Sequence, residues 1–319
     1  MTRQQGSTTT ESRLTGRVFL VTGASSGLGL ATARELAARG GQVILAVRDE
    51  AKGRRAADGI AAAHPGASLE VRRVDLADLD SVRNLADEVR AAHPRLDVLV
   101  NNAGIMAPPR TLSPQGHELQ FAANHLGHFA LTGLLLDPLS AGRDPRIVTV
   151  TSFNHRKARI DFDDLAAERG YRPMPRYDQS KLANAAFGYE LHRRLTEAGS
   201  PVRSLLAHPG YAATGLQTDG PVGLVSLLFG RLLKPFAQSA EGGALSQLHA
   251  ATAPGVEGGA CYGPGGRGEM RGAPKRVELG ATATDPATGR RLWEVSERLT
   301  DVRFAFPTAQ GAADGTASP

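Results

Sequence analysis

The sequence has almost no cysteine, the residue that forms disulfides and many metal sites in small proteins. Its 319 residues include one cysteine, Cys261, which excludes an internal disulfide framework and any site built from several thiolates. No run of 18 uninterrupted apolar residues occurs, so we expect no transmembrane segment. The nearest approach, residues 221–236, is interrupted by Arg231 and Lys234. A hydrophobic content of 41% and a mean hydropathy of −0.23 are typical of a soluble protein.

Charge of one sign is also in short supply. The 37 Lys and Arg residues exceed the 32 Asp and Glu residues by a formal charge of only +5, and this excess is spread along the chain. Such a balance argues against a nucleic-acid groove and argues only weakly for an anionic ligand. We expect a small-molecule substrate, no nucleic-acid partner and no metal site; a homo-oligomer stays open.

The two ends are expected to be loose. Residues 1–14 are polar and lack an apolar targeting core, which predicts a flexible arm and a cytoplasmic protein. Residues 304–319 are small and polar, and we expect them to be disordered. Residues 15–303 would then form a single catalytic domain.

Within this domain, β-branched runs alternate with helical patterns, as in a parallel sheet with crossover helices. We therefore predict an α/β fold, a single Rossmann-type doubly wound parallel sheet of about seven strands with helices on both faces. The predicted strands are 17–22, 42–47, 69–74, 97–101, 146–151, 202–207 and 260–262. The predicted helices include 27–39, 81–92, 116–136 and 177–198.

Glycine is abundant, at 37 residues, and one cluster of it follows the first predicted strand. Residues 22–29 read Thr-Gly-Ala-Ser-Ser-Gly-Leu-Gly and lead into a helix. Glycines at a strand-to-helix turn let backbone N–H groups approach a pyrophosphate. A tight structural turn is the alternative. The candidate phosphate-binding residues are Gly23, Ser25, Ser26, Gly27, Leu28 and Gly29.

The end of the second predicted strand bears on the choice of dinucleotide. Dinucleotide folds place there an acid for the ribose hydroxyls of NAD or a basic residue for the 2′-phosphate of NADP. Val47 occupies the acid position and Arg48 follows it, which favours NADP(H). Arg48 could instead cap the turn, and Asp49 keeps NAD(H) open.

Tyr177 and Lys181 lie one helical turn apart on the same face of the last long predicted helix. No other tyrosine in the sequence has a lysine at this spacing. A nearby cation favours the phenolate and lowers the pKa of a tyrosine, which suits a general acid/base. The alternative is a surface contact between the two side chains.

These features occur together with Asn101-Asn-Ala-Gly104 after the fourth strand and Ser152 after the fifth. In this order the set resembles the short-chain dehydrogenase/reductase family over residues 17–303. Asp75 and Leu76 resemble its adenine-contacting segment. Residues 208–214 resemble its P-G-x-x-x-T segment, which seats the nicotinamide carboxamide through Pro209, Gly210 and Thr214.

The resemblance implies transfer of a hydride between nicotinamide and an alcohol, ketone or aldehyde. Tyr177 would exchange a proton with the substrate oxygen, which Ser152 would hold. Lys181 would bind the nicotinamide ribose and keep Tyr177 acidic, and Asn124 would support a proton relay. Ser152 could instead cap a strand end, and Asn124 could be a buried amide bonded to backbone. Further residues implied to bind the cofactor are Asn102, Ala103 and Gly104.

The long interval from Ser152 to Tyr177 and the segments 180–184, 261–264 and 291–296 resemble the retinol dehydrogenase and protochlorophyllide reductase-like branch. That branch implies NADP(H) and lipophilic substrates. Residues 211–237 would then form a substrate lid. Its apolar part, 221–236, would line an apolar pocket or hold the lid against the body; a shallow membrane-surface helix, core packing and a subunit contact are the alternatives.

Other candidate residues favour structural interpretations. His125 and His128 lack a convincing third metal ligand and are expected to be buried and structural. His155, Arg156 and Lys157 are expected to be solvated, and Cys261 to be a packed thiol. A catalytically silent dinucleotide-binding regulator is the alternative function, but it would normally show a damaged tyrosine or lysine.

Overall fold

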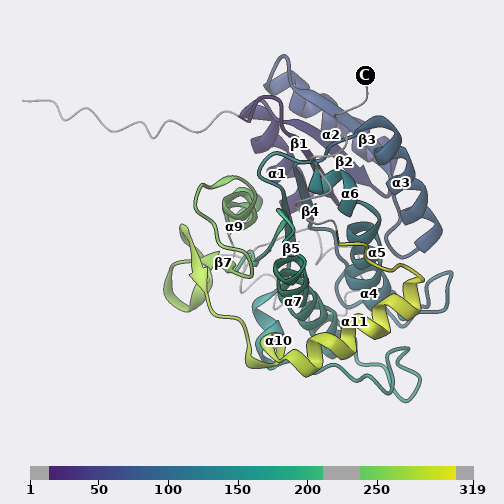
Figure 1. The fold of residues 1–319 in the computed structure, drawn as a ribbon. Coiled ribbons are helices and arrows are strands. Elements are labelled where there is room, and N and C mark those ends of the chain that lie inside the picture. The colour runs from purple at the N-terminus through teal and green to yellow at the C-terminus, as the bar shows by residue number, and fades with distance from the viewer. Residues whose placement is uncertain (1–13, 211–237, 307–319) are drawn as a thin grey trace, which may run out of the picture.

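One sheet organises the chain, and the computed structural model describes residues 14–210 and 238–306 of it (Figure 1). The strand order is β3-β2-β1-β4-β5-β6-β7-β8, and every neighbouring pair is parallel except β7 and β8. The strands are β1 (Val18–Thr22), β2 (Gln42–Val47), β3 (Ser68–Arg73), β4 (Val98–Asn101), β5 (Arg146–Val150), β6 (Arg203–Ala207), β7 (Cys261–Pro264) and β8 (Pro274–Val277).

The predicted doubly wound sheet is confirmed, with one strand more than expected. The additional strand, β8, is a short antiparallel edge strand of sequence Pro-Lys-Arg-Val. Lys275 and Arg276 are exposed on it. Charged residues are common on sheet edges because they discourage pairing with another chain. They also leave β8 without the apolar pattern by which the other strands were predicted.

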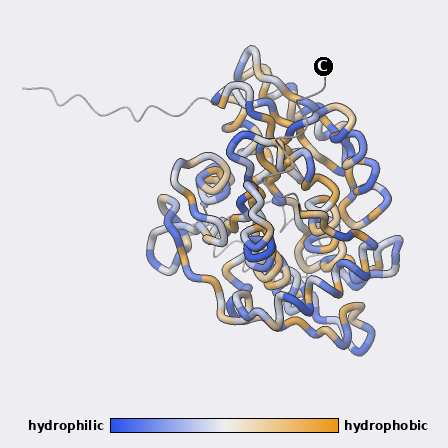
Figure 2. The backbone as a smooth tube through the Cα atoms, in the orientation of Figure 1, coloured by the Kyte–Doolittle hydropathy of each residue, from blue (hydrophilic) through white to orange (hydrophobic). Residues whose placement is uncertain are grey.

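Helices cover both faces of the sheet. One apolar cluster joins the sheet to α1, α2 and α9, and another joins it to α3, α5, α7 and α11. Hydrophobic residues accordingly concentrate in the central strands (Figure 2). The helices are α1 (Gly27–Ala38), α2 (Glu50–Ala63), α3 (Leu79–Ala92), α4 (Leu119–Phe121), α5 (Gly127–Leu134), α6 (Leu136–Ser140), α7 (Pro173–Glu197), α9 (Ala240–Thr252), α10 (Ala281–Thr284) and α11 (Pro286–Thr300).

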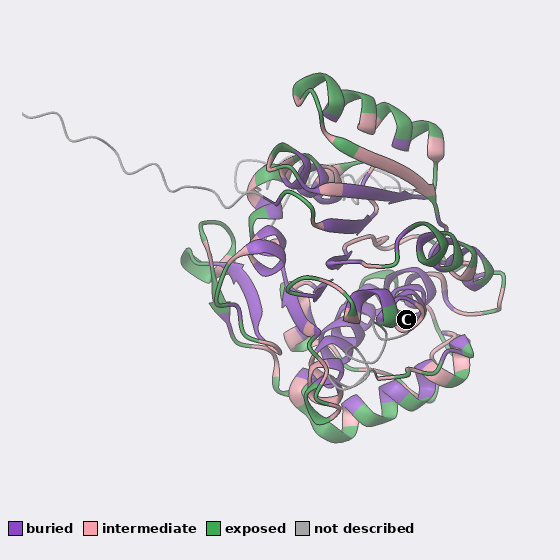
Figure 3. Cartoon of the chain, turned by 45° about the horizontal axis from the view of Figure 1, so that its top comes forward, coloured by how far each residue is buried: buried purple, intermediate pink, exposed green. Residues whose placement is uncertain are grey.

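Burial is uneven across the sheet. The central strands β1, β4 and β5 are buried throughout, whereas β3 has no fully buried residue and α2 buries only Gly53 and Ile60 (Figure 3). Within residues 14–210 and 238–306, no helix is both long and apolar enough to cross a bilayer.

Two predicted helices differ from the structure near the motifs. The predicted helix 116–136 is divided into α4, a π-helical segment η1 (Ala122–Leu126), and α5. Single π turns inside helices are frequent at functional sites. The predicted helix 177–198 begins four residues earlier, at Pro173, because proline suits the first turn of a helix.

The predicted ends of the domain need correction. Leu14, assigned to the flexible arm, is 2% exposed, and its N–H donates to the carbonyl of Arg39. Phe304, assigned to the disordered tail, packs on Trp293 with ring centroids 4.5 Å apart. Phe306 packs on the same indole. Aromatic burial thus extends the ordered chain beyond residue 303.

The strand order reverses between β1 and β4, and open α/β sheets bind their ligands beyond the carboxyl ends of the strands at such a position. The glycine turn follows β1 and residues 102–104 follow β4. Ser152 and His208 follow the neighbouring strands β5 and β6. The fold therefore gathers motifs from four distant segments at one edge of the sheet.

Candidate active site

The structure brings Ser152, Tyr177 and Lys181 together beyond the end of β5. The Ser152 side chain lies close enough to the Tyr177 hydroxyl to lower its pKa. Lys181 Nζ lies 5.8 Å from the Tyr177 ring centroid and donates to the Val150 carbonyl at 3.3 Å. Tyr177 and Lys181 share one face of α7, which packs over the strand end. The arrangement places a phenol, a hydroxyl and an ammonium close together at this edge of the sheet.

Burial dominates the electrostatics of this group. It raises the pKa of Tyr177 to about 12, although the nearby Ser152 side chain opposes the shift. Burial also lowers the pKa of Lys181 to about 8. The net shift of the Tyr177 pKa is therefore upward, opposite to the lowering that was predicted from the neighbouring Lys181. Desolvation penalises the charged form of each group more than the pair gains at this separation.

Ser152 also caps the segment that follows it. Its Oγ accepts from the Asn154 N–H at 3.3 Å, at the start of the 3-10 helix η2 (Phe153–Lys157). The capping alternative is therefore seen in the structure. It does not exclude a contact with Tyr177, because a hydroxyl has one donor and two acceptor positions.

Asn124 lies in the π-helical segment and is fully buried. Its Oδ1 accepts from the Ile105 N–H at 2.8 Å, and its Nδ2 donates to the Ile105 carbonyl and to Ser180 Oγ. The side chain thus fits the alternative of a buried amide bonded to backbone. It ties the segment after β4 to α7. A Cβ on Gly104 would lie 3.2 Å from Asn124 Oδ1 and 3.3 Å from Lys181 Nζ, so this close approach favours glycine.

The glycine turn has the backbone geometry that an anion site requires. Gly23 and Gly27 have φ values of +68° and +52°, which glycine adopts without strain. Ser26 stands at the N-cap of α1, yet its side chain makes no capping hydrogen bond. Side chains do cap α2, α3, α9 and α11. The first-turn N–H groups of α1 are therefore open to an anion such as a pyrophosphate.

Thr22 connects the glycine turn to the segment after β4. Its Oγ1 accepts from the N–H groups of Asn102 at 2.9 Å and Ala103 at 3.0 Å. Asn102 returns a bond from Nδ2 to the Thr22 carbonyl at 2.8 Å. These bonds fix two of the predicted cofactor segments relative to each other.

His128 extends this connection, and it is a residue that the sequence interpretation left without a partner. Its Nδ1 lies 2.9 Å from the Asn124 carbonyl, which only accepts, so Nδ1 carries the proton. Burial lowers the pKa of His128 to about 4, which leaves Nε2 as an acceptor for Thr22 Oγ1 at 2.9 Å. His125 is also fully buried, against Ser296. The predicted burial of both histidines is confirmed.

The end of β2 presents Arg48 to solvent. Val47 is buried, and the Asp49 carboxylate caps α2 by accepting from the Lys52 N–H at 3.0 Å. This carboxylate already serves as a hydrogen-bond acceptor at the helix N-terminus. Arg48 therefore is the free side chain of this turn that could meet a phosphate.

The remaining predicted cofactor residues fall into two groups. Asp75 Oδ1 accepts from the Ala77 N–H at 3.0 Å, and the Leu76 carbonyl lies where a Cβ on Gly127 would come within 2.2 Å of it. Pro209 and Gly210 follow β6 at the same edge of the sheet. Thr214 and the predicted lid, 211–237, lie outside the described residues.

The expectation of solvated residues after Ser152 is wrong for His155, which is 1% exposed. It holds for Lys157, while Arg156 is half-buried and paired with Glu269. Cys261 is packed as expected, and burial raises the pKa of its thiol to about 12. Glu269 escaped notice because it lies in a glycine-rich turn that carried no other signal.

Comparison with known proteins agrees with this arrangement. A family model described as short chain dehydrogenase matches residues 17–221, which include the glycine turn, Ser152, Tyr177 and Lys181. The chain belongs to the short-chain dehydrogenase family. It is therefore an oxidoreductase of a family that binds nicotinamide dinucleotides.

The relatives place this short-chain dehydrogenase in the retinol dehydrogenase-like branch. Human retinol dehydrogenase 12 is 38% identical over 92% of this chain and 90% of its own length. Mouse polyprenol dehydrogenase is 41% identical over 89% of this chain and 84% of its own length. The crystal structure of an uncharacterized protein from Mycobacterium paratuberculosis aligns with a TM-score of 0.77 and 43% identity, over 93% of this chain and 97% of that one.

Proposed function

We propose that this short-chain dehydrogenase uses NADP(H) to interconvert a lipophilic alcohol and its ketone or aldehyde. The observation that carries the proposal is that Ser152, Tyr177 and the buried Lys181 lie together at the carboxyl ends of the strands. Ser152 and Tyr177 can bind a substrate oxygen, Tyr177 supplies a proton, and Lys181 supplies a positive charge.

The dinucleotide would be held by the open first turn of α1, residues 102–104 and the Pro209–Gly210 turn. Bound there, it supplies or accepts the hydride. Ser152 Oγ and the Tyr177 hydroxyl bind the substrate oxygen by hydrogen bonds and orient the reacting carbon. In reduction the Tyr177 hydroxyl donates its proton to the forming alkoxide, and in oxidation the Tyr177 phenolate takes the proton of the alcohol. Lys181 stabilises the resulting phenolate by its charge.

NADP(H) is favoured by the end of β2. Arg48 is exposed beside the open turn, whereas Asp49 is engaged in capping α2. A guanidinium can bind a 2′-phosphate through two parallel hydrogen bonds, which gives a preference for NADP(H) over NAD(H).

A lipophilic substrate is favoured by exposed apolar side chains close to the site. Phe153 directly follows Ser152 and is 39% exposed, and Met174, one turn before Tyr177, is 42% exposed. Exposed apolar groups beside polar catalytic groups are typical of a site for an apolar ligand. The relatives named for retinol and for polyprenol point to the same substrate class.

The test is a panel of aliphatic, aromatic and isoprenoid alcohols and carbonyl compounds, followed by the absorbance of NADPH and of NADH. We expect turnover with isoprenoid and other long apolar members, and Tyr177→Phe should lower kcat about 100-fold or more without weakening NADPH binding. Ser152 remains to bind substrate in this variant, so the loss isolates proton transfer. Undiminished turnover by Tyr177→Phe would reject the acid/base role. Cofactor binding without turnover of any member would favour a dinucleotide-binding regulator.

A further inference from the structure

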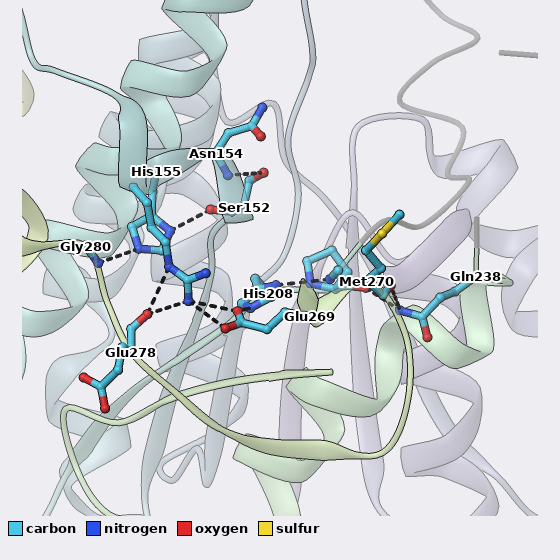
Figure 4. Close-up of polar contacts among 12 residues, drawn as sticks. Ser152, Asn154, His155, His208, Gln238, Glu269, Met270, Glu278 and Gly280 are labelled. Carbon is cyan, nitrogen blue, oxygen red and sulfur yellow. Dashed lines mark hydrogen bonds and ion pairs between the residues drawn. The ribbon is translucent and has the colours of Figure 1, made fainter. Parts of the chain in front are cut away.

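The carboxylate of Glu269 lies between two loops of the proposed active site (Figure 4). Its Oε2 is 2.9 Å from Arg156 Nη2 and 2.9 Å from His208 Nε2. Arg156 belongs to η2, which begins directly after Ser152. His208 directly precedes Pro209 and Gly210. One side chain from the β7–β8 connection therefore joins the serine loop to the turn proposed to seat the nicotinamide.

The bond from His208 has a defined donor. The Gly210 N–H donates to His208 Nδ1 at 3.2 Å, so the ring proton resides on Nε2 and is donated to Glu269. Burial lowers the pKa of His208 to about 4, which keeps the ring neutral. A Cβ on Gly263 would lie 2.2 Å from Nε2, so the ring packs directly on β7. Its orientation is thus fixed by packing as well as by hydrogen bonds.

The serine side of the connection is equally ordered. His155 Nδ1 donates to the Ser152 carbonyl at 2.7 Å, and His155 Nε2 accepts from the Gly280 N–H at 3.1 Å. Arg156 Nη2 also donates to the Glu278 carbonyl at 2.6 Å. Two consecutive side chains of η2 therefore anchor the main chain of Ser152 to residues 278–280 (Figure 4).

The nicotinamide side packs against the backbone of the same connection. Gly210 has a φ of +67°, and a Cβ there would lie 2.5 Å from the Met270 carbonyl. Gln238 Nε2 donates to the carbonyls of Pro209 and Met270, each at 2.9 Å. Glu269 itself has a φ of +55°, an uncommon conformation for a residue other than glycine. Such conformations persist where surrounding contacts compensate for them, and they cluster at functional sites.

We propose that Glu269 is a positioning residue that holds the Ser152 loop and the Pro209–Gly210 turn in one register. The substrate oxygen and the nicotinamide would then face each other at the distance that hydride transfer requires. The inference rests on the proposed function, because it presumes a nicotinamide at Gly210. It adds a residue that contacts neither substrate nor cofactor and that acts through Arg156 and His208.

The decisive variant is Glu269→Gln, which keeps the shape of the side chain and removes its charge. We expect the affinity for NADPH and kcat each to fall about tenfold, because the nicotinamide turn loses its partner. The affinity for 2′-phospho-ADP-ribose, which lacks the nicotinamide, should not change, since the glycine turn and Arg48 make no contact with Glu269. Both affinities are measured by titration calorimetry. If the substitution only impaired folding, the affinities for NADPH and for 2′-phospho-ADP-ribose would fall together.

The matched control is Glu257→Gln, which breaks a solvent-exposed pair with Arg276 on β8 and should leave every value unchanged. Arg156→Gln opens only the serine side, so we expect kcat to fall and the KM for the alcohol to rise at constant NADPH affinity. Arg156→Lys should restore part of this loss. This half-exposed position keeps the test decisive should Glu269→Gln fail to fold.

Unchanged kcat and NADPH affinity in Glu269→Gln, or equal losses for NADPH and the fragment, would overturn the proposal. Failure of the proposed cofactor is recognised separately. If wild-type protein binds ADP-ribose more tightly than 2′-phospho-ADP-ribose, the cofactor is NAD(H). The comparison of whole cofactor with fragment is then made with NADH and ADP-ribose. The effect of Glu269 is then judged on NADH by the same two outcomes.

Discussion

Burial shifts the pKa values of Tyr177 and Lys181 toward their neutral forms. The pKa of Tyr177 rises to about 12 and that of Lys181 falls to about 8. A buried group that is hard to ionise destabilises the fold wherever solvent would charge it. Near neutral pH this cost falls on Lys181, because Tyr177 is neutral in the folded and the unfolded chain below pH 10.

Lys181→Met should expose this cost. Below pH 8 the buried ammonium is charged at a cost, so the variant should be about 3 kcal/mol more stable at pH 7 while losing activity. Between pH 8 and 10 the unfolded lysine binds more protons than the folded one, so wild-type stability rises with pH. The advantage of the variant should shrink over that window. Denaturant unfolding at pH 7, 8.5 and 10 measures it, and a constant difference would contradict the assigned shift.

The proposed preference for NADP(H) depends on one exposed side chain, that of Arg48. Arg48→Ala should weaken NADPH binding about tenfold or more and leave NADH binding unchanged, because only the 2′-phosphate loses a partner. Arg54→Ala is the control, since Arg54 pairs with Glu50 on the exposed face of α2. Equal affinities for both cofactors before mutation would reject the NADP(H) preference.

At the scale of elements, hydrogen bonds at the ends of the strands join the segments of the proposed site. Thr22 ends β1 and accepts two N–H groups from the segment after β4, while His128 on α5 is bonded to the same hydroxyl. The π-helical segment places Asn124 so that its carbonyl meets His128. Three elements that are distant in sequence thus share one buried hydroxyl group. Buried networks of this kind are costly to leave partly satisfied.

Thr22→Val tests this junction with a side chain of the same shape. The variant leaves the N–H groups of Asn102 and Ala103 without their acceptor, so we expect a loss of about 2–4 kcal/mol in the free energy of unfolding. Cofactor affinity should fall as well, because the glycine turn and residues 102–104, two predicted cofactor-binding segments, meet at Thr22. Thr300→Val is the control, since that buried hydroxyl donates to the Ser296 carbonyl of its own helix. Equal losses in the two variants, measured by urea unfolding, would argue against a special role for Thr22.

At the scale of the whole molecule, the chain after α11 closes the core beneath α5 and α7. Phe304 contacts Phe129, Phe187 and Trp293, with ring centroids 4.9, 6.3 and 4.5 Å apart. A Cβ on Gly133 would lie 2.8 Å from the Phe304 ring. Residues 304–306 therefore belong to the folded body and not to a tail.

Two truncations separate these aromatics from the residues beyond them. A chain ending at Phe306 should retain a wild-type melting temperature, whereas a chain ending at Arg303 should lose about 3 kcal/mol or more through the exposed aromatic pocket. Differential scanning calorimetry of both truncations makes the comparison. Identical melting temperatures would show that the Phe304 contacts contribute little.

The order and type of most elements could be predicted from the sequence. Strands buried on both faces read as continuous apolar runs, and glycines after β1 marked the turn, because both signals depend on near neighbours in the chain. The predicted burial of His125, His128 and Cys261 followed from residue type and context. The edge strand β8 and the π-helical break before α5 left no comparable local pattern.

The sequence by itself determined the family, the parallel architecture and the chain order of the motifs, since periodicity, glycine spacing and the Tyr177–Lys181 interval are local properties. The tertiary structure alone decided the pKa of Tyr177, the burial of His155 and the place of Phe304. It alone brought Glu269 to His208 and Arg156. Desolvation and contacts between distant segments exist only after the chain has folded, and no window of sequence contains them.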